Sequence, residues 1–208
     1  MSLAPEDATR LEECLAADGV AVIPTDTVYG LACNPDSESA VRRVYELKRR
    51  APLKPAAVMF FALEPALESL AELGPRTRVV LRALLPGPVT PLLPNPEQRF
   101  PLACDPLGSG SALVGLRVPA LSGSLAVLTA VRAPASQSSA NVSGGADPRR
   151  LGDVSVELRE GADLVLDGGE LPGMASTVVD LSEYEQSGRW RIVREGPLDR
   201  LALERLLG

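Results

Sequence analysis

The chain has 208 residues and a net charge of −6, and its 45% hydrophobic and 23% charged residues are typical of a soluble globular protein. It contains no histidine, which excludes Ser-His-Asp and Cys-His catalysis, while its acidity and 3% aromatic content argue against a broad nucleic-acid surface. Because neither a signal peptide nor a membrane-spanning apolar run is recognisable, we expect a cytoplasmic protein that does not enter a membrane.

The N-terminal half is expected to alternate helices and strands. Apolar residues at helical spacing predict a helix over about Pro5–Asp18, and the apolar run Val20–Ile23 predicts a buried strand. Asp36 or Ser37 is expected to cap a second helix, which ends in the basic residues Lys48-Arg49-Arg50. The other elements of this half are a strand over Ala56–Phe61, helices over Glu64–Leu73 and Pro75–Leu85, and a short strand after the turn Pro86–Thr90.

The C-terminal half begins with the proline- and glycine-rich segment Pro94–Ser111, which is expected to be a surface loop. A strand over Ser111–Val118 and a helix over Ser122–Arg132 then precede the polar cluster Ser138–Gly145. Asp153 is expected to cap a short helix. The last elements are the strands Leu164–Leu166, Ser176–Leu181 and Trp190–Val193, the polar turn Glu183–Gly188 and a final helix from about Leu198.

The order of these elements predicts the fold class. Strands and helices intermingle, and several neighbouring strands are too close in sequence for a crossover helix between them. We therefore expect an α/β protein, one domain over residues 1–208, built on a twisted mixed sheet with flanking helices and an open cleft on one face.

The segment Gly19–Gly30 is the first candidate for a functional site. An apolar strand stops at Pro24, and polar and apolar side chains then alternate up to Gly30. Hydroxyls and a carboxylate at the edge of a sheet are where α/β proteins commonly hold ligands. An ordinary polar turn after a strand would have the same composition, so the segment alone leaves both interpretations open.

A cluster of basic residues follows the second predicted helix. Lys48, Arg49, Arg50 and Lys54 offer point charges and planar guanidinium forks, which suit phosphate groups. Cations at the C-terminus of a helix are also favourable by themselves, by roughly 0.3–1 kcal/mol, because they oppose the helix dipole. A solvated helix end is therefore the alternative interpretation.

Two further features could bind an anion. The Ser139–Gly145 cluster contains small hydroxyls, one carboxamide and adjacent glycines, which let backbone N–H groups approach a ligand closely, although a plain glycine-rich turn would look the same. Arg117 lies at the end of an apolar strand, so it needs a carboxylate or phosphate partner from the protein or from a ligand. Ser176 and Arg194 lie beside two later strands, where each alone would be taken as structural.

Taken together, these stretches resemble the YrdC-type threonylcarbamoyl-AMP synthase family in its short, single-domain form. They follow the family's order and spacing over about residues 7–200, and the joint match is far more specific than any single motif. The resemblance implies one YrdC-like catalytic domain. The matching stretches are Pro24-Thr25-Asp26-Thr27-Val28-Tyr29-Gly30, Lys48-Arg49-Arg50-Ala51-Pro52 with Lys54-Pro55, Pro86-Gly87-Pro88-Val89-Thr90, Arg117-Val118-Pro119, Ser139-Ala140-Asn141-Val142-Ser143-Gly144, Ser176-Thr177-Val178-Val179-Asp180 and Arg194.

The resemblance implies a nucleotidyltransferase reaction in which L-threonine, bicarbonate and ATP give L-threonylcarbamoyladenylate and pyrophosphate. The product serves the N6-threonylcarbamoyl modification of adenosine 37 in tRNA. Because the substrates supply both nucleophile and leaving group, the protein needs mainly to position them and to neutralise phosphate charge. Mg²⁺ is expected with ATP, without assignable protein ligands, and a tRNA-modification transferase complex is the expected user of the product. Direct RNA binding is expected to be weak or absent.

The family pattern also implies residue roles. ATP is assigned to Lys48, Arg50, Lys54, Ser139, Asn141 and Arg194, of which Lys48, Arg50, Ser139 and Asn141 are the expected catalytic residues. Threonine is assigned to Thr27, Tyr29, Arg117 and Ser176, with Arg117 taking its carboxylate.

The chain also departs from the family pattern. Met59 stands where longer members often have a histidine, Leu113 where a threonine is common, and Gln137 where small residues are common. Two alternative functions stay open, and these departures support only the second of them. One is an RNA-binding or translation-associated module, and the other is a diverged homologue that handles a carbamoyl-adenylate without threonine.

Overall fold

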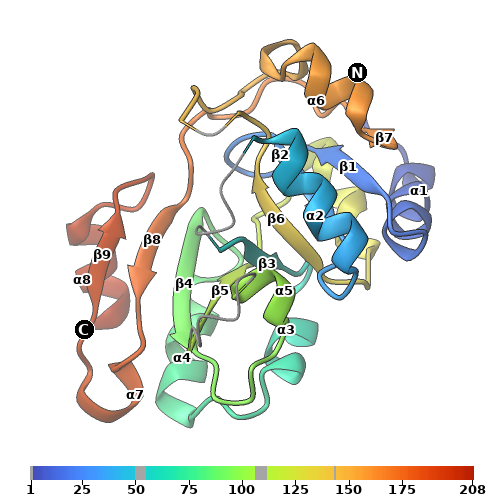
Figure 1. The fold of residues 1–208 in the computed structure, drawn as a ribbon. Coiled ribbons are helices and arrows are strands. Elements are labelled where there is room, and N and C mark those ends of the chain that lie inside the picture. Colours follow the sequence, from blue (N-terminus) through green and yellow to red (C-terminus); the bar gives the residue numbers. More distant parts are fainter. Residues whose placement is uncertain (1, 50–54, 106–111, 143) are drawn as a thin grey trace.

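The fold is built on one mixed β-sheet, seen in a computed structural model that describes residues 2–49, 55–105, 112–142 and 144–208 (Figure 1). In this described part, nine strands lie in the order β7-β1-β2-β6-β3-β5-β4-β8-β9. The strands are β1 (Val20–Ile23), β2 (Gly30–Cys33), β3 (Ala57–Met59), β4 (Val89–Pro94), β5 (Leu113–Arg117), β6 (Ala135–Ser139), β7 (Leu164–Val165), β8 (Thr177–Asp180) and β9 (Arg191–Arg194). Three strand pairs are parallel, β1 with β7, β3 with β5 and β4 with β8, and the other neighbours are antiparallel, which confirms the predicted mixed sheet.

Helices flank this sheet, as predicted. Ser37 caps the second helix, because its hydroxyl accepts a hydrogen bond from the Ala40 N–H. Of the two caps predicted from the sequence, Asp36 and Ser37, the structure confirms Ser37. Among the described residues, no helix has the length and apolar character needed to cross a bilayer. The helices are α1 (Pro5–Ala16), α2 (Glu38–Leu47), α3 (Leu63–Ser69), α4 (Pro75–Leu84), α5 (Pro101–Cys104), α6 (Val156–Gly161), α7 (Tyr184–Ser187) and α8 (Arg200–Leu207), with 3₁₀ segments η1 (Gly123–Ala130) and η2 (Leu151–Asp153).

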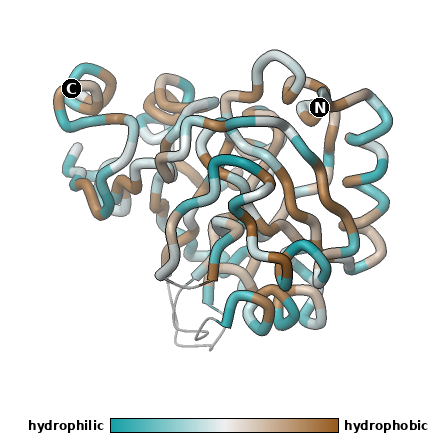
Figure 2. The backbone as a smooth tube through the Cα atoms, turned by 90° about the horizontal axis from the view of Figure 1, so that it is seen from above, coloured by the Kyte–Doolittle hydropathy of each residue, from teal (hydrophilic) through white to brown (hydrophobic). Residues whose placement is uncertain are grey.

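The core forms on both faces of the sheet. Along β1 the side chains of Ala21 and Ile23 join the cluster under α1 and η1, whereas Val20 and Val22 join the cluster under α2 and α6. All four are fully buried, which explains why this strand is a continuous apolar run instead of an alternating one. A third cluster packs α3, α4 and α8 against strands β3, β5, β4 and β8. Figure 2 shows the hydrophobic interior segments in brown and the hydrophilic outer turns in teal.

Several local predictions were wrong in the kind or the start of an element. The segment Pro94–Ser111 contains the short helix α5, and the expected turn at 183–188 contains α7. The helix expected over Ser122–Arg132 is the 3₁₀ segment η1. Ser155, and not Asp153, caps α6, since its hydroxyl accepts the Leu158 N–H.

Strand β6 is the larger omission. Its sequence, Ala135-Ser136-Gln137-Ser138-Ser139, lacks the β-branched and aromatic residues that signal a strand. It is a strand because β2 pairs with one edge of it and β3 with the other. This pairing carries Ser139 to the end of the strand, beside Gly30 of β2, and so places part of the predicted polar loop at the edge of the sheet.

Candidate active site

One cavity of about 360 Å³ gathers residues from most of the chain. It lies where strands β3, β5, β6 and β8 meet β4 and the loop between β1 and β2. Apolar side chains, including those of Leu92, Leu113 and Val178, line it together with polar ones. The cavity brings together five of the site residues predicted from the sequence: Thr27, Arg117, Ser139, Ser176 and Arg194.

The loop between β1 and β2 is held by internal hydrogen bonds and presents Thr27 to the cavity. The Thr25 hydroxyl donates to the Val28 carbonyl at 2.7 Å and accepts from the Thr27 and Val28 N–H groups at 3.2 and 3.3 Å. The hydroxyls of Thr25 and Thr27 lie 2.9 Å apart, and the Thr27 carbonyl accepts the Gly173 N–H at 2.8 Å. Both threonines are buried, so their hydroxyls have fixed positions before any ligand binds.

Arg117 enters the cavity from the last position of β5 and is almost fully buried. Its Nη2 forms an ion pair with Asp26 Oδ1, and its Nη1 donates to the carbonyls of Gly87 and Val89. Burial lowers the pKa of Arg117, and the charge and hydrogen bond of Asp26 act in the opposite direction. The partner that the sequence required is therefore, in this structure, a carboxylate of the protein itself.

The guanidinium of Arg117 still has donors to offer. No described residue accepts a hydrogen bond from its Nε–H, and one Nη2–H remains beside the one donated to Asp26. Two N–H donors of this kind can bind a carboxylate in a bidentate pair. The ion pair with Asp26 thus leaves two guanidinium N–H donors for a second anionic partner.

Ser176 and Arg194 form the opposite wall. The Ser176 hydroxyl lies 2.7 Å from that of Thr90, and its carbonyl accepts from Arg194 Nε at 3.2 Å and Nη2 at 2.8 Å. Gly196 keeps this corner tight, because an added Cβ would lie 2.3 Å from the Thr177 nitrogen. No described carboxylate forms an ion pair with Arg194, and its charge lowers the pKa of Arg117 further. The cavity therefore has a net positive charge on its described walls.

Lys48 and Asn141 adjoin the cavity through Ser139. Lys48 is only 2% exposed, and its Nζ donates to the Ser139 carbonyl and, at 3.3 Å, to Asn141 Oδ1. The same Asn141 oxygen accepts the Ser139 hydroxyl at 2.7 Å, and its Nδ2 donates to the Gly145 carbonyl at 2.7 Å. This network ties the end of α2 to the end of β6 and holds a cation beside the cavity wall.

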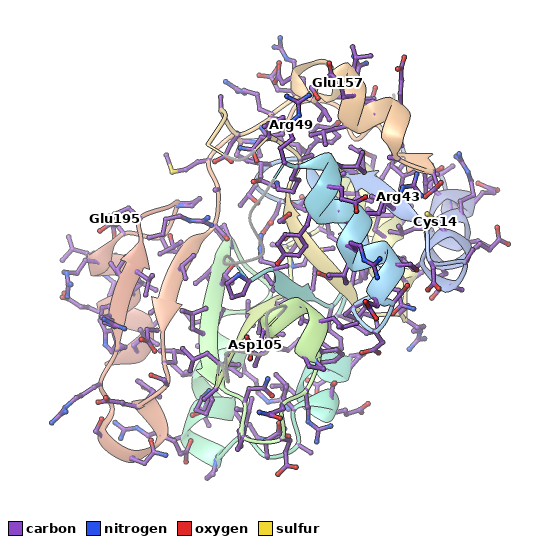
Figure 3. The ribbon with its side chains drawn as sticks, in the orientation of Figure 1. Cys14, Arg43, Arg49, Asp105, Glu157 and Glu195 are labelled. Atoms are coloured by element: carbon purple, nitrogen blue, oxygen red, sulfur yellow. The ribbon has the colours of Figure 1, made fainter. Side chains whose placement is uncertain are left out.

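The predicted basic cluster does not act as one unit. Lys48 turns inward to β6, whereas Arg49, which follows the C-cap of α2 with a left-handed φ of 47°, lies near Glu157 of α6 (Figure 3). The solvated helix end expected as an alternative therefore describes Arg49 but not Lys48. Arg50 and Lys54, both assigned to ATP, lie outside the described residues.

Tyr29 is directed elsewhere than the sequence interpretation assumed. Its hydroxyl donates to the Gly169 carbonyl at 2.8 Å, lies 3.1 Å from Asp167 Oδ1 and accepts the Gly168 N–H at 3.0 Å. Burial and the contact with Asp167 raise the pKa of Tyr29 to about 12. The side chain therefore anchors the turn after β7, and its assignment to threonine stays a prediction.

A comparison with known proteins identifies the family. The profile of the Sua5/YciO/YrdC family, described as "Telomere recombination", matches residues 13–196. The chain belongs to this family.

The threonylcarbamoyl-AMP synthase of Pyrococcus abyssi is 32% identical over 187 residues, which make up 89% of this chain and 52% of the relative. The Homo sapiens enzyme of that name is 34% identical over 194 residues, covering 88% of this chain and 64% of its own length. The chain thus spans between about half and two thirds of the length of these relatives. The threonylcarbamoyl-AMP synthase of Hahella chejuensis is 32% identical to this chain. The match covers 87% of this chain and 94% of that relative.

Solved structures agree with this membership. The crystal structure of P. abyssi Sua5 complexed with L-threonine superposes with a TM-score of 0.85 at 28% identity, covering 100% of this chain and 59% of that one. E. coli YciO gives a TM-score of 0.75 at 22% identity and covers 94% of this chain, which shows a common fold.

The departures from the family pattern fall in different places. Met59 is fully buried in the cluster under α1 and η1, so this difference from the Sua5/YciO/YrdC pattern lies in the core. Leu113 and Gln137 both line the cavity. These two substitutions therefore alter the walls of the site itself.

Sequence reasoning missed three contributors to the site. Asp26 and Thr90 stood inside matched motifs but received no role, although their partners Arg117 and Ser176 did. Ser138 lines the cavity, and none of the described residues forms a hydrogen bond with its buried hydroxyl. Ser138 began the polar cluster seen in the sequence, but it received no role because the pairing of β6 with β2 and β3 was not predicted.

The described residues do not provide a metal site. They contain no group of three or more His, Cys, Asp or Glu side chains that could hold an ion, and none of those lining the cavity is a carboxylate. Oxygen ligands from carboxylates are what Mg²⁺ takes from proteins. Any Mg²⁺ in the reaction has no assignable ligand among these side chains.

Proposed function

We propose that the protein is an L-threonylcarbamoyladenylate synthase, which makes threonylcarbamoyl-AMP and pyrophosphate from L-threonine, bicarbonate and ATP. The observation that carries this proposal is the convergence of Thr27, Arg117, Ser139, Ser176 and Arg194 on one positively charged cavity. Relatives that this chain matches over most of its length are named threonylcarbamoyl-AMP synthase, and P. abyssi Sua5 has been crystallised with L-threonine.

The threonine end of the site is assigned to Arg117, Thr27 and Ser176. The unused Nε–H and Nη2–H of Arg117 match the two oxygens of an amino-acid carboxylate. The hydroxyls of Thr27 and Ser176, both buried at the cavity wall, are then available to the rest of the amino acid. Because these groups are fixed by their neighbours, binding costs little further ordering of the protein.

The nucleotide end is assigned to Lys48, Ser139, Asn141 and Arg194, with Arg50 and Lys54 as further phosphate ligands from the sequence. The threonine amine captures carbon dioxide derived from bicarbonate, and the carbamate oxygen then attacks the α-phosphorus of ATP. Pyrophosphate leaves with the electrons of the broken P–O bond. The protein's part is to align the two substrates and to offset phosphate charge, which Lys48 and Arg194 can do as preorganised cations.

Mg²⁺ enters the proposal only as the ion that accompanies ATP. Mg²⁺ usually keeps several waters and binds through substrate phosphates, which suits a site without a carboxylate cluster. We assign no step of the reaction to it. We also propose that a tRNA-modification transferase complex takes over the product.

The test is pyrophosphate release from ATP and bicarbonate, measured with and without L-threonine. The proposal expects release that depends on threonine. An RNA-binding or translation-associated module would release none, and a carbamoyl-adenylate-handling homologue would release pyrophosphate at a rate indifferent to threonine. Either result would overturn the proposed function.

A further inference from the structure

Asp26 is a buried carboxylate with no role in the proposed reaction. Its side chain is 7% exposed and that of Arg117 is 3% exposed. Oδ1 accepts from Arg117 Nη2, and Oδ2 accepts from the Ala120 N–H at 2.9 Å. Each oxygen therefore already has a donor from the protein, and Asp26 is not among the described residues that line the cavity.

The contacts of Asp26 fix the orientation of a neighbouring guanidinium. The carbonyls of Gly87 and Val89 hold Nη1 of Arg117, and Asp26 holds Nη2. A planar guanidinium held at both terminal nitrogens cannot rotate, so the Nε–H and the remaining Nη2–H keep one direction. Asp26 also compensates a buried positive charge that would otherwise be costly.

The same carboxylate connects two parts of the site. Asp26 precedes Thr27 in the loop between β1 and β2, whereas Arg117 and Ala120 belong to the end of β5 and the residues after it. Its two hydrogen bonds tie this loop to that strand end. The spacing between the Thr27 hydroxyl and the Arg117 guanidinium therefore depends on Asp26.

We propose that Asp26 is a positioning residue for recognition of the substrate carboxylate, acting through Arg117 and not by touching the substrate. This inference rests on the proposed function, because it takes the amino-acid carboxylate as the ligand of Arg117. On this inference, the cavity binds a charged carboxylate more tightly than a neutral group of similar shape because Asp26 holds Arg117 in place.

Asp26→Asn is the direct test. An amide has one acceptor oxygen and one NH₂ group, so it must turn a donor toward either the Arg117 Nη2–H or the Ala120 N–H. Asp180→Asn is a matched control: Asp180 is 9% exposed, its Oδ1 accepts the Ser182 N–H at 3.0 Å, and its Oδ2 accepts from Arg191 at 2.8 and 3.0 Å. Asp180 combines the same two kinds of partner but does not line the cavity.

The readout is the ratio of the Kd values for L-threonine and L-threonine methyl ester, measured by calorimetry on the full chain. The wild type should prefer the free acid, and Asp26→Asn should reduce this preference by about tenfold, with a matching rise in KM for threonine and little change in KM for ATP. Asp180→Asn should keep the wild-type ratio. If Asp26→Asn also keeps it, the positioning role is wrong.

Asp26→Ala provides a second measurement if Asp26→Asn does not fold. Formate added during refolding can occupy the place of the lost carboxylate, with chloride at equal ionic strength as its control. The proposal is supported if formate, but not chloride, restores the preference of Asp26→Ala for L-threonine over its methyl ester. Two results would overturn the proposal. In one, formate restores the melting temperature of Asp26→Ala but not its preference for L-threonine over the methyl ester. In the other, Asp26→Ala shows this preference without formate.

The proposed function fails in a different way from this inference. A wild type that shows neither threonine-dependent pyrophosphate release nor a preference for the free acid refutes the assignment of threonine to the cavity. A wild type with both properties, accompanied by an Asp26→Asn variant that retains them, refutes only the role of Asp26.

Discussion

The substitution Tyr29→Phe tests whether this side chain serves the fold or the substrate. The ring stays, and only the hydroxyl with its contacts to Gly168, Gly169 and Asp167 is lost. The Gly168 N–H then loses its acceptor and the Gly169 carbonyl loses its donor, while Asp167 keeps the Gly169 N–H at 3.0 Å. A side chain that serves the fold alone predicts a loss of stability with unchanged threonine binding, whereas the assignment of Tyr29 to threonine predicts weaker threonine binding as well.

The magnitude follows from these contacts. A phenol has a single hydrogen to donate, so the side chain contributes one donated and one accepted hydrogen bond at a time. At about 0.5–1.5 kcal/mol for each, the free energy of unfolding should fall by about 1–3 kcal/mol. For a domain of this size each kcal/mol corresponds to about 2–4 °C, so the melting temperature should fall by about 2–12 °C.

Tyr184→Phe is the matched control, because the Tyr184 hydroxyl makes one hydrogen bond, to the Leu207 carbonyl at 2.7 Å, and Tyr184 does not line the cavity. We expect it to lower stability by about 0.5–1.5 kcal/mol. Melting temperature and KM for threonine are measured for both variants, and neither KM should change by more than about twofold. A Tyr29→Phe protein with an unchanged melting temperature and a raised KM would refute the reasoning and return Tyr29 to the threonine site.

Three other predictions concern the phosphate end and the pH. Lys48→Met removes the cation that contacts Ser139 and Asn141, and kcat/KM for ATP should fall about ten- to a hundredfold; an unchanged value would place Lys48 outside the reaction. Burial raises the pKa of Cys33 from 9.0 to about 12, so the folded state retains this proton above pH 9 and stability should be lost as the pH rises toward 12. Denaturant unfolding between pH 8 and pH 11 should show this decline, and Cys33→Ala should make it shallower. Arg50→Ala, predicted from the sequence alone, should lower kcat/KM for ATP about ten- to a hundredfold, with partial recovery in Arg50→Lys, and equal pyrophosphate release in all three proteins would remove Arg50 from the site.

The sequence by itself determined most of the local structure. Strand β1 and helix α2 were predictable because a continuous apolar run and a Ser37 cap are local signals that need no distant partner. The sequence also supplied the chemical inventory of the site: hydroxyls, guanidiniums, a carboxamide and no histidine. From these residue types one could predict anion binding without acid–base catalysis by an imidazole.

Only the tertiary structure decided which of these groups act together. The polar segment of β6 is a strand because β2 and β3 form hydrogen bonds with its backbone on both edges. Its own side chains do not predict this pairing. Arg117 and Asp26 lie 91 positions apart, and both were visible in motifs, but nothing local indicates that they form an ion pair. The physical reason is that a buried charge takes whichever opposite charge the packed fold brings within reach, and that choice is made by the sheet and not by the neighbouring residues.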